Sequence, residues 1–414
     1  MLHARPAVAT IITKLIVSLA RFRPAVEAFS QTDAVLNLAQ RFRDVSDASS
    51  PWESATRALR GGLMRAIALL LPTSCGAVES VAQCLPQLVQ AARLGHGTLQ
   101  RMACAVIVLL TSAPVVDAAL DVAARLPDLQ LPVPLGRAAA ARSDSQNAGD
   151  SALSPADLLL RLRSAVMPPL VDQMRAGVRY RTVPRMLHAV ISNDEVLARA
   201  AADTSALEQL AAIVVSEVRT SRWRNLRRLR SQSPLSACGA AQAELLGAGS
   251  EDAMALDAAA TSCVAATDVL HAAFQCIELL CSCSSPDTPG ATNATAVLWE
   301  RHRAAVCTPA AIAAMCRCLA HPDATVRLAV AKSLRVLARS QDAFTQETLG
   351  DGQLAEALVL ALRGDEATSV EVCLAISNFV TTPSSPARQQ FFDKVRCPAH
   401  SAPDPAVPRA CTRT

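Results

Sequence analysis

One pattern occurs twice between residues 308 and 380, and it constrains the fold more than any other feature of the chain. Three positions of the first copy return 42 residues later with the same chemical character: Asp323 as Asp365, Leu334 as Ile376, and Leu337 as Phe379. Each copy has a short apolar helix, a polar turn and a longer amphipathic helix. Helical repeats of this length bury their apolar faces by stacking on one another. The sequence therefore predicts an all-α fold, an α-solenoid with loop insertions.

The composition favours the same fold class. Apolar residues make up 51% of the chain but aromatic residues only 3%, so a core of alanine, leucine and valine is expected. Small side chains of this kind suit closely packed helices, and alternating β-branched runs are scarce. A net charge of +4 over 414 residues is too small to indicate a nucleic-acid-binding protein. Nearly all basic residues are arginine, which is typical of GC-rich codon usage, so arginine runs alone are weak evidence for a nucleic-acid partner.

The second copy resembles an armadillo repeat. The resemblance is carried by Gly352-Gln353-Leu354 before an apolar helix, by the turn Gly364-Asp365, and by the run Cys-Leu-Ala-Ile-Ser-Asn-Phe that ends at Phe379. The first copy, with Asp-Ala-Thr-Val-Arg from Asp323, resembles a HEAT repeat equally well. The resemblance covers residues 308–381 and identifies a superfamily, the armadillo/HEAT helical repeats. It implies that the solenoid winds as a right-handed superhelix.

The resemblance implies a binding groove lined by the last helix of each repeat, which holds extended peptides or helices. Asn378 stands at the groove position of its repeat, and Ser377 and Arg335 are further candidate groove residues. Nuclear-import adaptors carry a tryptophan with an asparagine four residues later. Here the equivalent pairs contain no asparagine: Trp52 with Thr56, Trp223 with Arg227, and Trp299 with Arg303. The sequence therefore gives no specific support for an import adaptor.

The rest of the chain divides by composition. Pro, Gly, Ser and Asp cluster in the segments that we expect to connect or follow helical regions. The predicted organisation is an N-terminal helical-repeat region (1–134), a linker (135–155), a middle helical region (156–283), a loop (284–296), C-terminal armadillo-like repeats (297–396) and a disordered tail (397–414).

Charge is distributed unevenly along the middle of the chain. Residues 161–230 hold 13 arginines and six acidic residues, whereas residues 231–300 hold eight acidic residues and no lysine or arginine. The basic segment ends in a predicted basic helix whose candidate partner-binding residues are Arg219, Arg222, Trp223, Arg224, Arg227 and Arg228. Three interpretations stay open: a solvated helix face, a dock for an acidic protein or for the chain's own acidic segment, and a nucleic-acid contact.

No metal or catalytic site is expected. Four cysteines and a histidine could be written as zinc ligands, namely Cys281, Cys283, Cys316, Cys318 and His321. Two residues separated by one position on a helix point to different faces, so each pair fits buried thiols better than zinc ligands. Phosphate loops, nucleophile elbows and kinase signatures are absent from the sequence. We therefore expect no enzyme activity and no cofactor.

The N-terminus allows two interpretations. Residues 1–26 contain Arg5, Lys14, Arg21 and Arg23 and no acid, which is the charge pattern of a mitochondrial presequence. The favoured interpretation is a first amphipathic helix, with its positive residues facing solvent, in a cytoplasmic protein. The longest uncharged run, residues 102–116, contains Pro114 and is too short to span a membrane.

Together these features predict a non-enzymatic armadillo/HEAT scaffold that mediates protein–protein interaction. Its partner would be a protein, bound as an extended peptide or a helix, with acidic chemistry favoured by the basic segment; nucleic acid is not the expected partner. One alternative is the non-catalytic helical-repeat part of a larger enzyme, such as a serine/threonine protein kinase. Another is an RNA-associated helical-repeat protein of an organelle.

Overall fold

The computed structural model confirms an all-α fold for the residues that it describes. All their regular elements are helices, and none is long and apolar enough to cross a membrane. The chain forms two compact units, Met1–Ile213 and Val214–Thr414. The described residues are 6–20, 22–48, 54–95, 97–112, 115–126, 129, 131, 154–175, 182–192, 195–202, 205–220, 250–283, 299, 301, 303–339 and 353–380. Most of the predicted linker, the predicted loop 284–296 and the predicted tail lie outside them.

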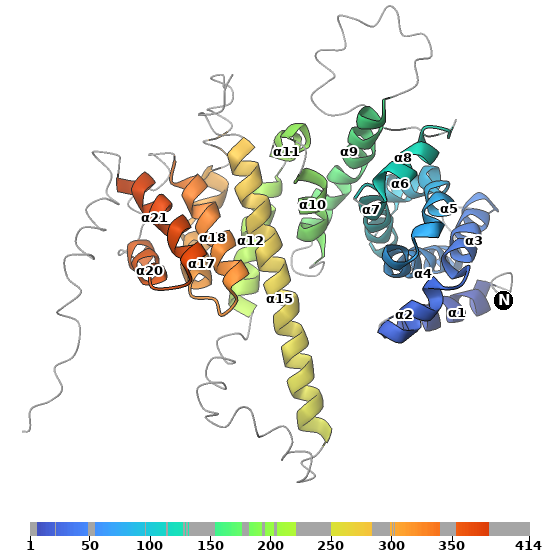
Figure 1. Ribbon diagram of the computed structural model, residues 1–414, viewed down its shortest axis with the longest axis horizontal. Coiled ribbons are helices and arrows are strands. Elements are labelled where there is room, and N and C mark those ends of the chain that lie inside the picture. Colours follow the sequence, from blue (N-terminus) through green and yellow to red (C-terminus); the bar gives the residue numbers. More distant parts are fainter. Residues whose placement is uncertain are drawn as a thin grey trace, which may run out of the picture. The chain divides into compact units, whose positions relative to one another are not determined.

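The first unit is a cluster of short helices (Figure 1). Helix α4 packs against α1, α3 and α7, and α7 packs in turn against α6 and α9. The helices are α1 (Pro6–Leu19), α2 (Arg23–Ser30), α3 (Ala34–Ala48), α4 (Ser54–Leu70), the 3₁₀ turns η1 (Leu71–Thr73) and η2 (Cys75–Ala77), α5 (Val78–Ala82), α6 (Leu85–Leu94), α7 (Thr98–Leu110), α8 (Val116–Ala123), α9 (Pro155–Met174), α10 (Val183–Ile191) and α11 (Glu195–Ala202). Helix α12 (Ala206–Thr220) contains the boundary between the two units.

Local sequence signals explain several of these helix ends. Ser154 caps α9 by accepting a hydrogen bond from the backbone N–H of Asp157 at 3.1 Å, and Pro155 occupies the first helical position. The pattern favours one helix over residues 77–94, but the structure has two, α5 and α6, because Pro86 starts a new helix. Gly97 has a positive φ of 59° and precedes α7.

Helix α1 exposes apolar side chains together with its lysine. Ile11 is 66% exposed and Leu15 is 57% exposed, while Ala9 and Val17 are buried. Lys14 is also exposed. The solvent face of α1 is therefore more apolar than the solvent face expected for the predicted amphipathic helix.

The second unit contains two layers of helices. Helices α15 (Ser250–Cys283), α18 (Ala324–Leu337) and α21 (Glu366–Val380) lie side by side in one layer, and α17 (Pro309–Leu319) and α20 (Gln353–Ala361) form the other (Figure 1). The hydroxyl of Ser333 in α18 donates to the carbonyl oxygen of Phe274 in α15 at 2.9 Å. Phe274 and Ile277 are fully buried, so the C-terminal half of α15 belongs to the core of the second unit.

Repeated aspartates cap the two long helices at equivalent positions. An oxygen of Asp323 accepts from the backbone N–H of Thr325 at 2.8 Å, and an oxygen of Asp365 accepts from that of Thr368 at 2.9 Å. Thr308 caps α17 in the same way. Side-chain acceptors at these positions satisfy N–H groups that the first helical turn leaves unpaired. The aspartates that recur in the sequence therefore have the same capping role at the starts of α18 and α21.

Arg327 links the two repeated turns. Its Nη1 donates to the carbonyl oxygens of His321 at 2.7 Å and Pro322 at 2.9 Å. Its Nε and Nη2 donate to the second carboxylate oxygen of Asp365 at 3.1 and 2.7 Å. The side chain is only 20% exposed, so these charge-assisted hydrogen bonds are partly protected from water.

Replacing Arg327 with glutamine should lower the free energy of unfolding by about 2 kcal/mol, because charge-assisted hydrogen bonds are removed and their acceptors stay partly buried. Chemical denaturation of the full chain measures the change. Arg317→Gln is the matched control, since Arg317 is exposed on α17 and should change stability by less than about 0.5 kcal/mol. Equal effects of the two substitutions would contradict the role of Arg327.

The ion pair between Arg327 and Asp365 should also make the free energy of unfolding depend on pH. Burial alone would raise the pKa of Asp365, but hydrogen bonds from Arg327 and Thr368 outweigh it and lower the pKa from 3.8 to about 2. A carboxylate with a lowered pKa stabilises the fold above its unfolded pKa, and this contribution is lost as pH falls from about 4 to about 2.

Asp365→Asn tests this dependence, because asparagine can still cap α21 but carries no charge. We expect the variant to be less stable than the wild type at pH 6, with the difference shrinking as pH falls from 4 to 2. Urea denaturation at a series of pH values measures it. A difference that stays constant over that range would show that the ion pair does not contribute.

Candidate functional site

A row of polar and charged side chains crosses the three-helix layer of the second unit. We call it the polar strip, and its members share partial burial and a position on the solvent side of their helices. The polar strip consists of His271, Gln275 and Glu278 on α15, Lys332 and Arg335 on α18, and Glu371 and Asn378 on α21. Within each helix these residues are three, four or seven positions apart, which places them on one face.

Arg335 lies at the centre of the polar strip between two carboxylates. Its Nε is 3.0 Å from Oε2 of Glu371, and its Nη2 is 3.9 Å from Oε1 of Glu278. The Nε–H is not aligned with the Glu371 oxygen, so the contact is an ion pair without a hydrogen bond. The side chains of Arg335, Glu278 and Glu371 are 26, 22 and 16% exposed. One guanidinium therefore compensates two carboxylates that are mostly removed from water.

The partial burial changes the proton affinities of the polar strip. Burial raises the pKa of Glu278, and the neighbouring charges of Lys332 and Arg335 oppose this rise. Burial lowers the pKa of His271, and the carboxylates of Asp323 and Asp268 oppose it. The lowered pKa favours the neutral imidazole at pH 7. The strip therefore carries charges of both signs and one neutral imidazole.

The predicted groove residues take different places in this arrangement. Asn378 donates a hydrogen bond from Nδ2 to the backbone carbonyl oxygen of Arg335 at 3.1 Å, so its amide joins α21 to α18. The sequence placed Asn378 and Arg335 on neighbouring repeats, but nothing in the sequence indicated this bond. Ser377 is exposed, and one residue along a helix turns its side chain about 100° away from that of Asn378.

The predicted basic helix is only partly described. Arg219 is exposed in the last turn of α12. The remaining candidates lie outside the described residues: Arg222, Trp223, Arg224, Arg227 and Arg228. A partner site on this segment therefore stays a prediction.

The cysteines considered as zinc ligands are mostly buried among apolar side chains. Cys281 and Cys318 are fully buried, and Cys283 and Cys316 are partly buried. Burial raises the pKa of Cys318 to about 12 and that of Cys316 to about 11, so both thiols stay protonated at pH 7. Within the described ranges, no group of three or more His, Cys, Asp or Glu side chains could hold a metal ion.

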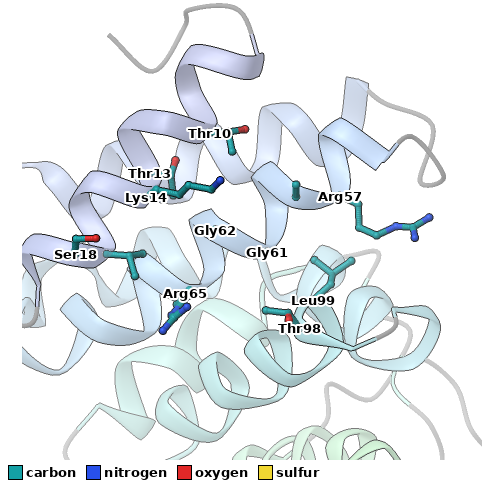
Figure 2. A pocket seen from close by; sticks show the side chains of 12 residues that line it. Thr10, Thr13, Lys14, Ser18, Arg57, Gly61, Gly62, Arg65, Thr98 and Leu99 are labelled. Atoms are coloured by element: carbon teal, nitrogen blue, oxygen red, sulfur yellow. The ribbon is translucent and has the colours of Figure 1, made fainter. Parts of the chain in front are cut away.

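The first unit contains a cavity that the sequence did not indicate. Its volume is about 650 Å³, and it lies between α1, α4 and the start of α7 (Figure 2). We call it the α1–α4–α7 cavity. Its lining includes Lys14 of α1, Gly61, Gly62 and Arg65 of α4, and Leu99 of α7. The adjacent glycines inside a helical segment were the signal that could have drawn attention to it, because glycine is a poor helix former.

Comparison with known proteins adds little to this geometry. No family model matches the chain, and no curated protein matches it. One solved structure, described as the crystal structure of an engineered protein, matches 95% of this chain and 96% of its own length, with 14% sequence identity and a TM-score of 0.26. So low a TM-score supports no statement about the fold.

Replacing Arg335 with methionine should leave Glu278 and Glu371 without their shared cation. We expect the pKa of Glu278 to rise further and the free energy of unfolding to fall by about 2 kcal/mol, because Glu371 loses its ion pair and Glu278 keeps only Lys332 of its two neighbouring cations. Carboxyl NMR titration and chemical denaturation measure the two effects. Arg339→Met, an exposed position just beyond α18, is the control. An unchanged Glu278 titration in Arg335→Met would contradict the coupling.

Proposed function

We propose that this chain is a non-enzymatic helical-repeat scaffold that binds a protein segment along the polar strip. The observation that carries the proposal is the strip itself, in which three adjacent helices contribute charged and amide groups to one surface. Its charges are held in fixed positions, since Arg335 lies between two carboxylates and Asn378 is bonded to α18. Polar groups in fixed positions make a binding surface specific for a partner with complementary groups.

The packing of the second unit supports an armadillo/HEAT-like solenoid as the architecture. The long helices α18 and α21 share one layer, the short helices α17 and α20 share the other, and corresponding caps are 42 residues apart. Arg327 joins one repeat to the next through Asp365. Stacked helical pairs with repeated contacts between neighbours form extended binding surfaces in repeat proteins.

The partner that fits this surface is an extended peptide or a helix with polar side chains of both signs. The polar strip contains two basic residues, Lys332 and Arg335, and two acidic residues, Glu278 and Glu371. This balance gives no preference for a strongly acidic or strongly basic segment. Exposed Leu374, one helical turn from both Glu371 and Asn378, supplies an apolar contact at the edge of the polar strip.

Leu374→Glu should weaken partner capture by at least about tenfold, because it places a charge where an apolar contact is buried on binding. The matched control is Leu360→Glu on α20, which makes the same change in the same repeat but in the other layer. Leu374 is 43% exposed and Leu360 is 57% exposed, so neither substitution disturbs the core. The measurement is an affinity pull-down with the full chain, quantified by mass spectrometry. Equal capture by both variants would contradict binding along the polar strip.

A further inference from the structure

The α1–α4–α7 cavity has the form of a small-molecule site. Its volume of about 650 Å³ falls within the range of about 300–1,000 Å³ that is usual for such sites. The cavity is lined by α1 and α4. The lining residues of α1 lie between Thr10 and Ser18, and those of α4 lie between Arg57 and Arg65. Both sets follow helical spacing, so one continuous face of each helix lines the cavity.

A glycine forms the inner wall of the cavity. Gly61 is buried, yet a Cβ atom added to it would meet no heavy atom within 4 Å. The space in front of it is therefore cavity and not packed core. A Cβ atom on the adjacent Gly62 would instead lie 3.1 Å from Cγ2 of Thr13, so Gly62 permits the close approach of α1 to α4.

The inner lining is apolar. The hydroxyl of Thr13 donates to the carbonyl oxygen of Ala9 at 2.7 Å, and its methyl group faces Gly62. Val17 and Ala58 line the cavity from α1 and α4, and Leu99 lines it from α7. The apolar part of a ligand would displace water from this surface, which lowers the free energy of the bound state.

The rim of the cavity is cationic. Lys14 and Arg65 are exposed, and neither forms an ion pair with a carboxylate of the described residues. No acidic residue is among the described residues that line the cavity. Figure 2 shows Lys14 extending from α1 toward the glycine pair, whereas the guanidinium of Arg57 turns outward. Thr98, the first residue of α7, also lines the cavity, and the positive end of that helix adds to the potential.

We propose that the α1–α4–α7 cavity binds an organic anion with a short apolar chain. The apolar chain lies against Gly61, Val17 and Leu99, and the carboxylate or phosphate head group lies at the rim between Lys14 and Arg65. Two cations that have no carboxylate of the described residues beside them favour a head group that carries a full negative charge. This site lies in the first unit and is independent of the polar strip of the second.

Isothermal titration calorimetry of the full chain tests the ligand class. The probes are decanoate and decyl phosphate, with decanol and inorganic phosphate as controls that lack either the charge or the chain. We expect at least one of the two amphiphilic anions to bind at least about tenfold more tightly than both controls. Comparison of decanoate with decyl phosphate decides which head group the rim prefers. Failure of both anions to bind, or equal binding by decanol, would overturn the proposal.

Two substitutions of one residue locate the site. Gly61→Leu should fill the cavity and weaken binding of the preferred anion at least about tenfold, whereas Gly61→Ala should leave it within about threefold. Both should keep or raise the melting temperature, because glycine is the poorer helix former and the added atoms enter empty space. A Lys14→Gln, Arg65→Gln double variant should reduce the advantage of the anion over decanol. Undiminished binding by a folded Gly61→Leu variant would overturn this location.

Discussion

The guanidinium group of Arg327 joins the two repeated turns of the second unit. Arg327 satisfies the carbonyl oxygens of His321 and Pro322 in one repeat and holds the cap carboxylate of the next, so it fixes the distance between α18 and α21. Eight residues after Arg327, roughly two helical turns along α18, Arg335 meets Glu371 of α21. The two contacts therefore join α18 to the following repeat at two levels, one at the turns and one in the polar strip.

The polar strip combines rigidity with charge. Carboxylates that are 16 and 22% exposed would cost free energy if they stood alone, and the guanidinium of Arg335 between them offsets that cost. Because Asn378 is bonded to the carbonyl of Arg335, the surface is already ordered before any partner binds. Ordered polar groups lose little further conformational entropy on binding, which favours recognition of a defined partner over general adhesion.

Local chemistry made part of this structure predictable. Ser154, Thr308 and Asp323 each accept a backbone N–H in the first turn of the helix that follows, and residues of this type can be recognised in a sequence because capping depends only on neighbours in the chain. Contacts between helices were not predictable in the same way. Periodicity shows which face of a helix is apolar, but it does not show which helix covers that face.

The cavity of the first unit and the bond from Asn378 illustrate this limit. Thr13, Gly61 and Leu99 are far apart in sequence, and only the packing of α1, α4 and α7 brings them together. Likewise, the sequence marked Asn378 as a candidate groove residue, but it did not show that the amide of Asn378 donates to a carbonyl oxygen of α18.

Hydrogen-exchange mass spectrometry of the full chain, with and without its captured protein partner, tests the central claim most directly. Binding along the polar strip predicts slower amide exchange in α15, α18 and α21, with α17 and α20 of the opposite layer unchanged. Protection restricted to α17 and α20, or to segments of the first unit, would contradict a scaffold that recognises its partner through the polar strip.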